Sequence, residues 1–211
     1  MSEKEEVISY LSKSISSKEL LDALRKIDRE KFLPDPYRHL AYSKDYVDKA
    51  IPITRNYNTT ALSLGILMLD LLELQNGEKV LEIGTGRGYY TALIAEIVGC
   101  ENVYSIEFDS EAYSLARKNL IECPVNLIFG DGSLGHEKAQ PYDKIVVWAA
   151  APTFPYVLYS QLKKRGIMVV PIADSGDKQG LYKIVKGEEP FIFRVTDVIF
   201  SKLKGLCGFW Y

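Results

Sequence analysis

Apolar runs and helical patterns alternate through the second half of the chain. Short runs rich in β-branched residues occupy residues 79–83, 103–107, 125–129, 144–148 and 167–172, and helical spacing of apolar positions occupies residues 89–98, 110–121 and 154–164. The predicted strands are apolar without strict alternation, which is typical of a parallel sheet covered by helices on both faces. The pattern therefore predicts an α/β fold with a doubly wound, mostly parallel, Rossmann-like sheet.

The two ends of the chain follow other patterns. Apolar positions at helical spacing in residues 20–27 predict an amphipathic helix, and residues 61–74 are apolar almost all round, as in a helix buried on most sides. Residues 51–60 between them are rich in Thr and Asn and predict a loop.

After Pro171 the alternation ends. Residues 181–185 and 191–195 flank a polar turn and predict an antiparallel hairpin, and residues 198–200 are a candidate for one more strand. We expect residues 1–74 to form an N-terminal helical and loop extension that covers the active site as part of the same domain, and residues 75–211 to form the main α/β domain.

Composition and charge exclude several classes of protein. The 211 residues are 47% hydrophobic and 26% charged with a net charge of −2, which is ordinary for a globular protein and gives no overall field for binding nucleic acid. No apolar run reaches the roughly 18 residues of a membrane span, and residues 1–6 are acidic where a signal peptide would be basic. The sequence predicts a cytoplasmic protein that binds neither membrane nor nucleic acid.

Cysteine and histidine give no sign of a metal site. Cys100, Cys123 and Cys207 form no C-x-x-C pair, so we expect buried, reduced thiols rather than a disulfide framework or a zinc site. The two histidines, His39 and His136, lie far apart in the sequence. No metal cofactor is predicted.

The most informative stretch is residues 80–90, where a strand enters a glycine-rich turn and a helix follows. Gly84, Gly86 and Gly88 give the spacing G-x-G-x-G, whereas a dinucleotide-binding turn is spaced G-x-G-x-x-G and faces a pyrophosphate. Glu82 precedes the turn, and its carboxylate would repel a pyrophosphate but suit a ligand with a cationic amino-acid portion. S-adenosylmethionine fits this description, because it carries an ammonium and a sulfonium and no phosphate.

Two further acidic residues follow the next two predicted strands. Glu107 lies about 20 residues after the turn, where an acid accepts hydrogen bonds from ribose hydroxyls in doubly wound nucleotide sites, and Asp131 could meet the adenine amino group. Each feature has an alternative, since the turn could be only a tight connection, Glu107 a helix cap and Asp131 a turn residue. Together the glycine turn, Glu107 and Asp131 indicate a cofactor site more specifically than any one of them, because they lie at the carboxyl ends of successive predicted strands.

These residues resemble the protein-L-isoaspartate O-methyltransferase family. The likeness is carried by residues 81–86 with Gly88 and Tyr89, by residues 130–135 and 141–145, and by the shorter pieces 32–34, 50–53 and 161–166. The resemblance implies a methyltransferase sheet and methyl transfer from S-adenosylmethionine, with S-adenosylhomocysteine as the product. The acceptor would be the free carboxylate of L-isoaspartyl residues in damaged proteins, whose repair then proceeds through a succinimide. The implied partners are isoaspartate-containing peptides and unfolded or aged proteins, and oligomeric state is not specified.

Cofactor and substrate residues follow from the motif positions. The predicted cofactor-binding residues are Glu82, Ile83, Gly84, Thr85, Gly86, Gly88, Glu107, Asp131 and Gly132. The resemblance aligns Thr60 with the active-site serine of the family, so Thr60 is the predicted catalytic residue. Asn58, Thr59 and Pro171 are the predicted substrate-binding residues.

Departures from the family pattern leave alternatives open. Thr60 could merely cap the helix that follows it. Arg87 replaces a small residue inside the glycine turn, so its side chain must point away from the cofactor or partly cover it. The altered loop 54–60 leaves two other functions open: a methyltransferase of the same fold acting on another carboxylate or small molecule, and a cofactor-binding homologue without turnover.

Overall fold

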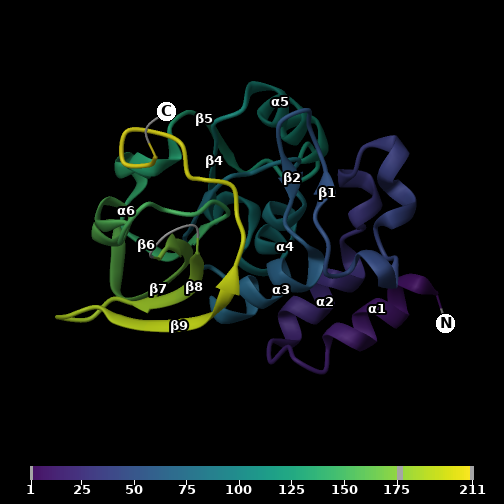
Figure 1. Ribbon diagram of the computed structural model, residues 1–211, viewed down its shortest axis with the longest axis horizontal. Helices are drawn as coiled ribbons and strands as arrows, with labels where there is room; N and C mark the ends of the chain where they lie inside the picture. The colour runs from purple at the N-terminus through teal and green to yellow at the C-terminus, as the bar shows by residue number, and fades with distance from the viewer. Residues whose placement is uncertain (1, 175–177, 210–211) are drawn as a thin grey trace.

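A seven-stranded sheet runs through the computed structural model, which describes residues 2–174 and 178–209 (Figure 1). Its strands are β3 (Val80–Ile83), β4 (Val103–Glu107), β5 (Asn126–Phe129), β6 (Tyr142–Val147), β7 (Leu162–Ala173), β8 (Gln179–Val185) and β9 (Phe191–Val198). They are arranged in the order β5-β4-β3-β6-β7-β8-β9. The first five pair in parallel, and β8 and β9 add an antiparallel meander at one side. The predicted fold class and the C-terminal hairpin are confirmed.

Helices cover both faces of the sheet, as expected for a doubly wound fold. They are α4 (Tyr89–Val98), α5 (Ser110–Asn119) and α6 (Tyr156–Ser160), with 3-10 turns η4 (Cys100–Asn102), η5 (Gly132–Leu134) and η6 (Glu137–Ala139). Helix α4 begins and ends where the sequence pattern predicted. Helix α6 is shorter than the predicted segment 154–164, because the chain enters β7 at Leu162, which pairs with Tyr142.

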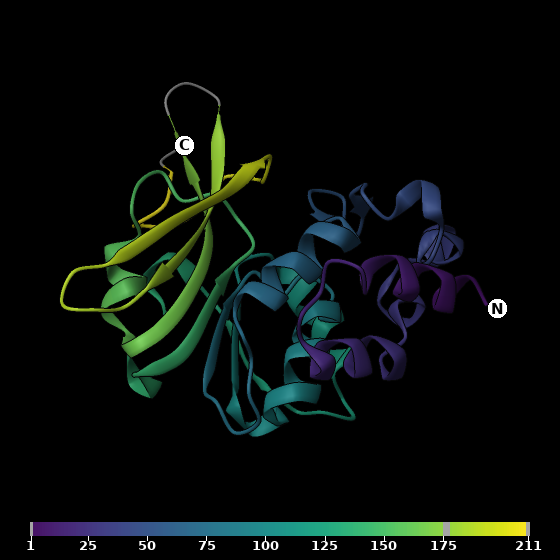
Figure 2. The ribbon, with the colours of Figure 1, turned by 90° about the horizontal axis from the view of Figure 1, so that it is seen from below.

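The N-terminal region packs against one face of this sheet (Figure 2). Its elements are α1 (Glu3–Leu11), α2 (Lys18–Lys26), η1 (Arg29–Phe32), η2 (Asp35–Leu40), η3 (Lys44–Tyr46), β1 (Ile51–Pro52), β2 (Asn58–Thr59) and α3 (Leu62–Leu71). Two sequence expectations need correction. Residues 51–60 are not a plain loop, because β1 and β2 pair in a short hairpin, and residues 198–200 form no separate strand, because Val198 ends β9.

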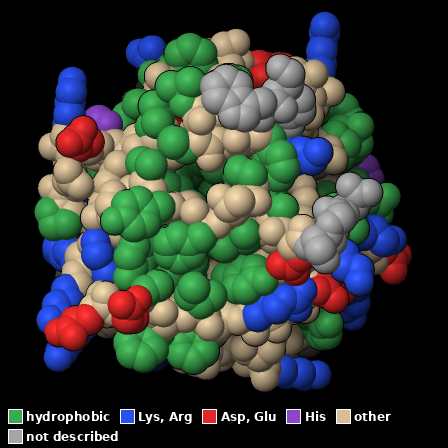
Figure 3. Space-filling view, turned by 60° about the vertical axis from the view of Figure 1, so that its left-hand side comes forward, with side chains coloured by type: hydrophobic (Ala, Val, Ile, Leu, Met, Phe, Trp, Pro, Cys, Tyr) green, Lys and Arg blue, Asp and Glu red, His purple; other side chains and the backbone are tan. Residues whose placement is uncertain are grey.

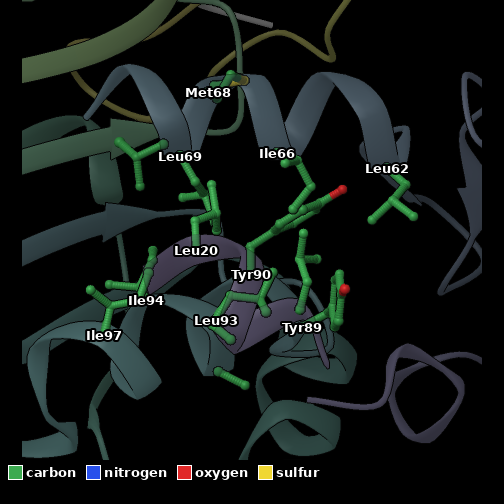
Figure 4. Packing of buried hydrophobic residues seen from close by; sticks show 14 of the residues in the cluster. Leu20, Leu62, Ile66, Met68, Leu69, Tyr89, Tyr90, Leu93, Ile94 and Ile97 are labelled. Carbon is green, nitrogen blue, oxygen red and sulfur yellow. The ribbon is translucent and has the colours of Figure 1, made fainter. Parts of the chain in front are cut away.

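Alternate residues of each strand feed two hydrophobic clusters, one on each face of the sheet. On one face Val80, Val146 and Val169 pack with the N-terminal helices, α3 and α4. On the other face Leu81 and Ile145 pack with α6 and the C-terminal segment. One cluster thus contains residues from both parts of the chain, which agrees with a single folding unit. Figure 4 shows the first cluster at the contact of α3 with α4, where Tyr89 and Tyr90 lie below Leu62 and Ile66.

The edge of the sheet at β9 leaves apolar side chains in contact with solvent. Phe191, Ile192 and Phe193 are exposed on this strand, and Tyr156 is exposed on α6. Hydrophobic side chains gather on the side of the molecule that carries α6 and the end of the β8–β9 hairpin (Figure 3). Among residues 2–174 and 178–209, no helix has the length and apolarity needed to cross a membrane.

Cys100 and Cys123 form a disulfide, so the expectation of three reduced, buried thiols was wrong. Cys100 precedes β4 and Cys123 precedes β5, and the parallel pairing of these strands brings the two Cα atoms to 5.5 Å although 23 positions separate them in the sequence. Cys207 is a free and exposed thiol, not a buried one. The disulfide lies at the amino ends of its strands, opposite the carboxyl ends.

The disulfide should stabilise the protein by constraining the unfolded chain. Replacing both Cys100 and Cys123 by serine is expected to lower the free energy of unfolding by about 3 kcal/mol, the value for a closed loop of this length. Urea unfolding without reductant measures this loss. The matched control is Cys207→Ser, which should change nothing, and equal stability of all three proteins would contradict the assignment.

Candidate functional site

A pocket opens at the carboxyl ends of β3 and β4, where open α/β sheets bind ligands. The empty space within it is about 1070 Å³, open space at its mouth included. The walls come from η1, the β1–β2 hairpin, the glycine turn, the ends of β4 and β6, and the C-terminal residues 201–204. Segments from the whole length of the chain therefore meet here.

The glycine turn forms the floor of the pocket. Gly86 has a φ of 58° and donates its backbone N–H to Glu107 Oε2 at 2.8 Å. A Cβ on Gly86 would lie 3.1 Å from Ile53, and a Cβ on Gly132 would lie 2.5 Å from Ile83 Cγ2. The Cβ positions of both glycines are thus already taken by neighbouring isoleucines, so these two packing contacts require residues without a side chain.

Nine of the predicted site residues line this pocket together. They are Asn58, Thr59, Thr60, Ile83, Gly84, Thr85, Gly86, Glu107 and Gly132. The other four are Glu82, Gly88, Asp131 and Pro171, and they lie outside the lining. Gly88 is the N-cap of α4 and packs against Leu120. Pro171 is buried in β7 opposite Leu181, and this position does not support the predicted contact with substrate.

Glu82 lies beneath the glycine turn and is fully buried. Its carboxylate accepts hydrogen bonds from Thr91 Oγ1 at 2.5 Å, Ser105 Oγ at 2.6 Å and Trp148 Nε1 at 2.8 Å. Ser105 is its cross-strand neighbour, so the register of β3 and β4 provides this contact. Burial raises the pKa of Glu82 to about 7, although the three hydrogen bonds favour the charged form. The side chain therefore joins α4, β4 and the end of β6 from below the pocket.

Glu107 lies at the edge of the pocket and is 8% exposed. Oε2 accepts from the Gly86 backbone and Oε1 accepts from the Asp109 backbone at 2.9 Å. Burial raises the pKa of Glu107 above its ordinary value, and the backbone donors oppose that rise. Two carboxylate oxygens offer about four acceptor positions, so this group can still accept hydrogen bonds from a ligand.

Asp131 holds the C-terminal segment instead of facing the pocket. Oδ1 accepts from Ser133, and Oδ2 accepts from the Leu206 backbone at 2.7 Å. Leu203 donates its N–H to the Ala150 carbonyl at 2.8 Å, and Ala150 donates to the Ser201 carbonyl. These bonds place residues 201–204 along one wall of the pocket. The sequence analysis did not predict that residues 201–204 form a wall of the pocket. Asp131 in its Gly-Asp-Gly turn was the only residue of this contact that it singled out.

The β1–β2 hairpin forms the opposite wall and carries Thr60 at its end. Ala61, not Thr60, is the N-cap of α3, and its side chain makes no capping bond, so the capping alternative for Thr60 was wrong. Within the described residues no hydrogen bond is recorded for Thr60 Oγ1. Tyr90 Oη donates to the Thr60 carbonyl at 2.9 Å and to the Ala61 carbonyl at 3.1 Å. The backbone at Thr60 is therefore fixed while its hydroxyl is available to a ligand.

Two contacts partly cover the pocket. Arg87 extends across the wall, where Nε donates to the Phe32 carbonyl at 2.8 Å. Arg87 is part of the pocket lining. Lys204 Nζ donates to Tyr57 Oη at 2.8 Å, which joins the C-terminal segment to the hairpin. The sequence did not predict this contact, because 147 positions separate the two residues.

The acidic side chains at and behind the pocket are hydrogen-bonded to other protein groups. No group of three or more His, Cys, Asp or Glu side chains that could hold a metal ion occurs within residues 2–174 and 178–209. The carboxylates near the pocket bind backbone N–H groups, hydroxyls and an indole instead. The lining is mainly apolar and aromatic with a few polar groups, which is typical of a site for an organic ligand.

Comparison with known proteins gives a consistent relationship over almost the whole chain. The family model described as protein-L-isoaspartate(D-aspartate) O-methyltransferase matches residues 2–205. The chain is 42% identical to a protein-L-isoaspartate O-methyltransferase of Ignicoccus hospitalis, over 85% of each chain. It is 38% identical to one of Methanothrix thermoacetophila, over 98% of this chain and 97% of the relative.

Solved structures agree in fold. A protein-L-isoaspartate O-methyltransferase superimposes with a TM-score of 0.84 at 28% identity, over 97% of this chain and 67% of the other. A Plasmodium falciparum structure described as a complex with S-adenosyl-L-homocysteine gives a TM-score of 0.81 at 21% identity, over 97% and 99% of the two chains. At that identity the second likeness concerns the fold alone.

The buried carboxylate of Glu82 should make stability depend on pH. In the unfolded chain it titrates near 4.3, so between about pH 4.5 and 7 the folded state holds a proton that the unfolded state has lost, and stability falls as pH rises. Glu82→Gln removes this titration. As the pH rises from about 4.5 to 7, the free energy of unfolding of the variant should increase by about 3 kcal/mol relative to that of wild type.

Urea unfolding of both proteins from pH 4.5 to 8 measures the difference. A gap that stays constant with pH would show that Glu82 keeps an ordinary pKa. Glu189→Gln is a suitable control, because that acid is exposed in the turn between β8 and β9.

Proposed function

The chain belongs to the protein-L-isoaspartate(D-aspartate) O-methyltransferase family, and on this premise we propose that it methylates the free carboxylate of L-isoaspartyl residues in damaged proteins. The methyl donor is S-adenosylmethionine. The methyl ester then closes to a succinimide, and hydrolysis of the succinimide restores part of the normal aspartate. The observation that carries the proposal is the convergence of the glycine turn, Glu107 and the free hydroxyl of Thr60 on one pocket.

The residues of the pocket fit this cofactor. Gly84, Gly86 and Gly132 line the pocket and carry no side chain, so a flat adenosine could lie close to the main chain there. Glu107 has acceptor capacity left for ribose hydroxyls. When bound, the cofactor supplies a methyl group on a sulfonium, which is a built-in leaving group.

We assign the cofactor site in two layers. The residues that would contact the cofactor are Ile83, Gly84, Thr85, Gly86, Glu107 and Gly132, which all line the pocket. Glu82, Gly88 and Asp131 support the site from behind, because they hold α4, the turn and the C-terminal segment. The glycine turn would separate the Glu82 carboxylate from a cationic ligand, so the attraction between them would act across the turn without direct contact.

Thr60 and the hairpin are the proposed acceptor site. Thr60 Oγ1 can donate a hydrogen bond to the substrate carboxylate, and the N-terminus of α3 beside it favours negative charge. Asn58 and Thr59 line the same wall and can hold the peptide on either side of the isoaspartate. A carboxylate is ionised at neutral pH, so the reaction needs neither a general base nor a metal.

Orientation and removal of water are then the main contributions of the protein. The bridge between Lys204 and Tyr57 and the stacking of Tyr90 on Trp148, with ring centroids 4.5 Å apart, keep the walls in place. Arg87 shields the pocket on the side of η1. These contacts would keep the walls fixed around an acceptor carboxylate and the cofactor's methyl group.

Paired peptides test the proposal directly. A peptide containing L-isoaspartate is expected to accept labelled methyl groups from S-adenosylmethionine, and the same peptide with normal aspartate is not. Equal labelling of both would remove the specificity. Cofactor binding without labelling of either would favour a homologue without turnover, and labelling of an unrelated small carboxylate alone would indicate another substrate class.

Thr60 can be tested by two substitutions of similar size. Thr60→Val removes the hydroxyl and should lower kcat/KM for the isoaspartyl peptide about 10-fold to 100-fold, the value of a hydrogen bond to a charged group. Thr60→Ser keeps the hydroxyl and should retain most activity. Steady-state kinetics measures both, and equal loss in the two variants would assign the effect to packing instead of hydrogen bonding.

A further inference from the structure

Three buried side-chain polar atoms have no hydrogen-bond partner within the described residues, and all belong to two neighbours in the pocket. They are Nε and Nη2 of Arg29 and the hydroxyl oxygen of Tyr89. Both residues line the pocket, and the Arg29 guanidinium carbon lies 5.8 Å from the centre of the Tyr89 ring. Unpartnered buried polar groups are rare in folded proteins and need an explanation.

Arg29 is a buried cation whose guanidinium is only partly hydrogen-bonded. It is 1% exposed, lies in η1, and uses only Nη1, which donates to the Ala41 carbonyl at 3.1 Å. No ion pair of Arg29 occurs among residues 2–174 and 178–209. Burial of a charge without a partner costs several kcal/mol, so the fold keeps this guanidinium at a cost that an anion would offset.

The unused edge of the guanidinium has the geometry of a carboxylate site. Nε and Nη2 lie on the same side of the planar group and donate in parallel, which matches the two oxygens of a carboxylate. Burial raises the pKa of Tyr89 well above its ordinary value, so its hydroxyl remains a hydrogen-bond donor. Two neighbouring residues of the pocket lining thus have three unused hydrogen-bonding atoms, each of which can donate.

Arg29 and Tyr89 lie close to the parts of the pocket that would hold the ligands of the proposed reaction. Tyr89 is the first residue of α4, immediately after the glycine turn, and Phe32 of η1 packs on its ring with centroids 5.7 Å apart. Tyr90, the next residue, bonds to the Thr60 carbonyl. The pair thus adjoins both the glycine turn proposed to hold the cofactor and the hairpin proposed to hold the acceptor.

We propose that Arg29 and Tyr89 form a binding site for a ligand carboxylate at this end of the pocket. The inference rests on the proposed function, which brings two carboxylates here, the α-carboxylate of the cofactor and the acceptor carboxylate of the substrate. The guanidinium is part of the wall and is shielded from bulk water, so its attraction for a carboxylate is weakly screened. This site could not be predicted from the sequence, because Arg29 lies in the charged stretch Asp28–Lys31, which is typical of a protein surface.

Calorimetry with two ligands separates the sources of the carboxylate. S-adenosylhomocysteine carries the amino-acid carboxylate, and 5′-methylthioadenosine lacks it. If the site holds the cofactor, Arg29→Met should weaken S-adenosylhomocysteine at least 10-fold and leave 5′-methylthioadenosine unchanged. If the site holds the acceptor, Arg29→Met should leave both affinities unchanged and raise KM for the isoaspartyl peptide at least 10-fold.

Matched variants keep the result interpretable. Arg29→Lys retains the charge and should recover part of the loss, and Tyr89→Phe removes one hydroxyl and should cost about threefold to 10-fold in the same parameter. Tyr89→Phe decides the matter if Arg29→Met does not fold. Glu107→Ala is the positive control, since lost ribose contacts should weaken both nucleosides.

Two different failures can be told apart. Folded Arg29→Met and Tyr89→Phe with wild-type affinities and wild-type KM would overturn the carboxylate site and leave the function intact. A wild-type protein that binds neither nucleoside would overturn the proposed function itself. Equal weakening of both nucleosides by Arg29→Met would also overturn the site, because it would show a general packing defect.

Discussion

The buried carboxylate of Glu82 connects the elements on which the pocket depends. It accepts hydrogen bonds from α4, β4 and the end of β6 at once, through Thr91, Ser105 and Trp148. The helix that follows the glycine turn is therefore held against the sheet next to the pocket. A carboxylate without donors could not remain at this depth, so these three partners must be present together with it.

The same network reaches the acceptor side of the pocket. Trp148 stacks on Tyr90, and Tyr90 bonds to the backbone at Thr60 and Ala61. A short chain of contacts thus connects the turn beneath the proposed cofactor to the hydroxyl proposed to bind the substrate. On the opposite wall, Asp131 holds the C-terminal segment, whose Lys204 returns to the hairpin at Tyr57. The N-terminal and C-terminal parts of the chain complete one site on a central sheet.

Features that depend on local sequence patterns could be predicted from the sequence. Features that depend on contacts between distant residues could not. The strands and helix α4 follow from hydrophobic periodicity and the glycine turn, and nine of thirteen predicted site residues line the pocket because strand ends converge at one edge of the sheet. The Cys100–Cys123 disulfide has no sequence motif, since strand pairing alone brings these residues together. The roles of Asp131 and Arg29 depend on partners 75 and 12 positions away, which no local pattern reveals.

The central claim is that one pocket holds both the cofactor and the isoaspartyl acceptor, with Thr60 at the meeting point. A crystal structure with S-adenosylhomocysteine and an isoaspartyl peptide tests it most directly. The account predicts the nucleoside along the Gly84–Gly86 backbone, its ribose on Glu107, and the peptide carboxylate within hydrogen-bond distance of Thr60 Oγ1. A nucleoside bound away from the glycine turn, or a peptide carboxylate that does not approach Thr60, would contradict it.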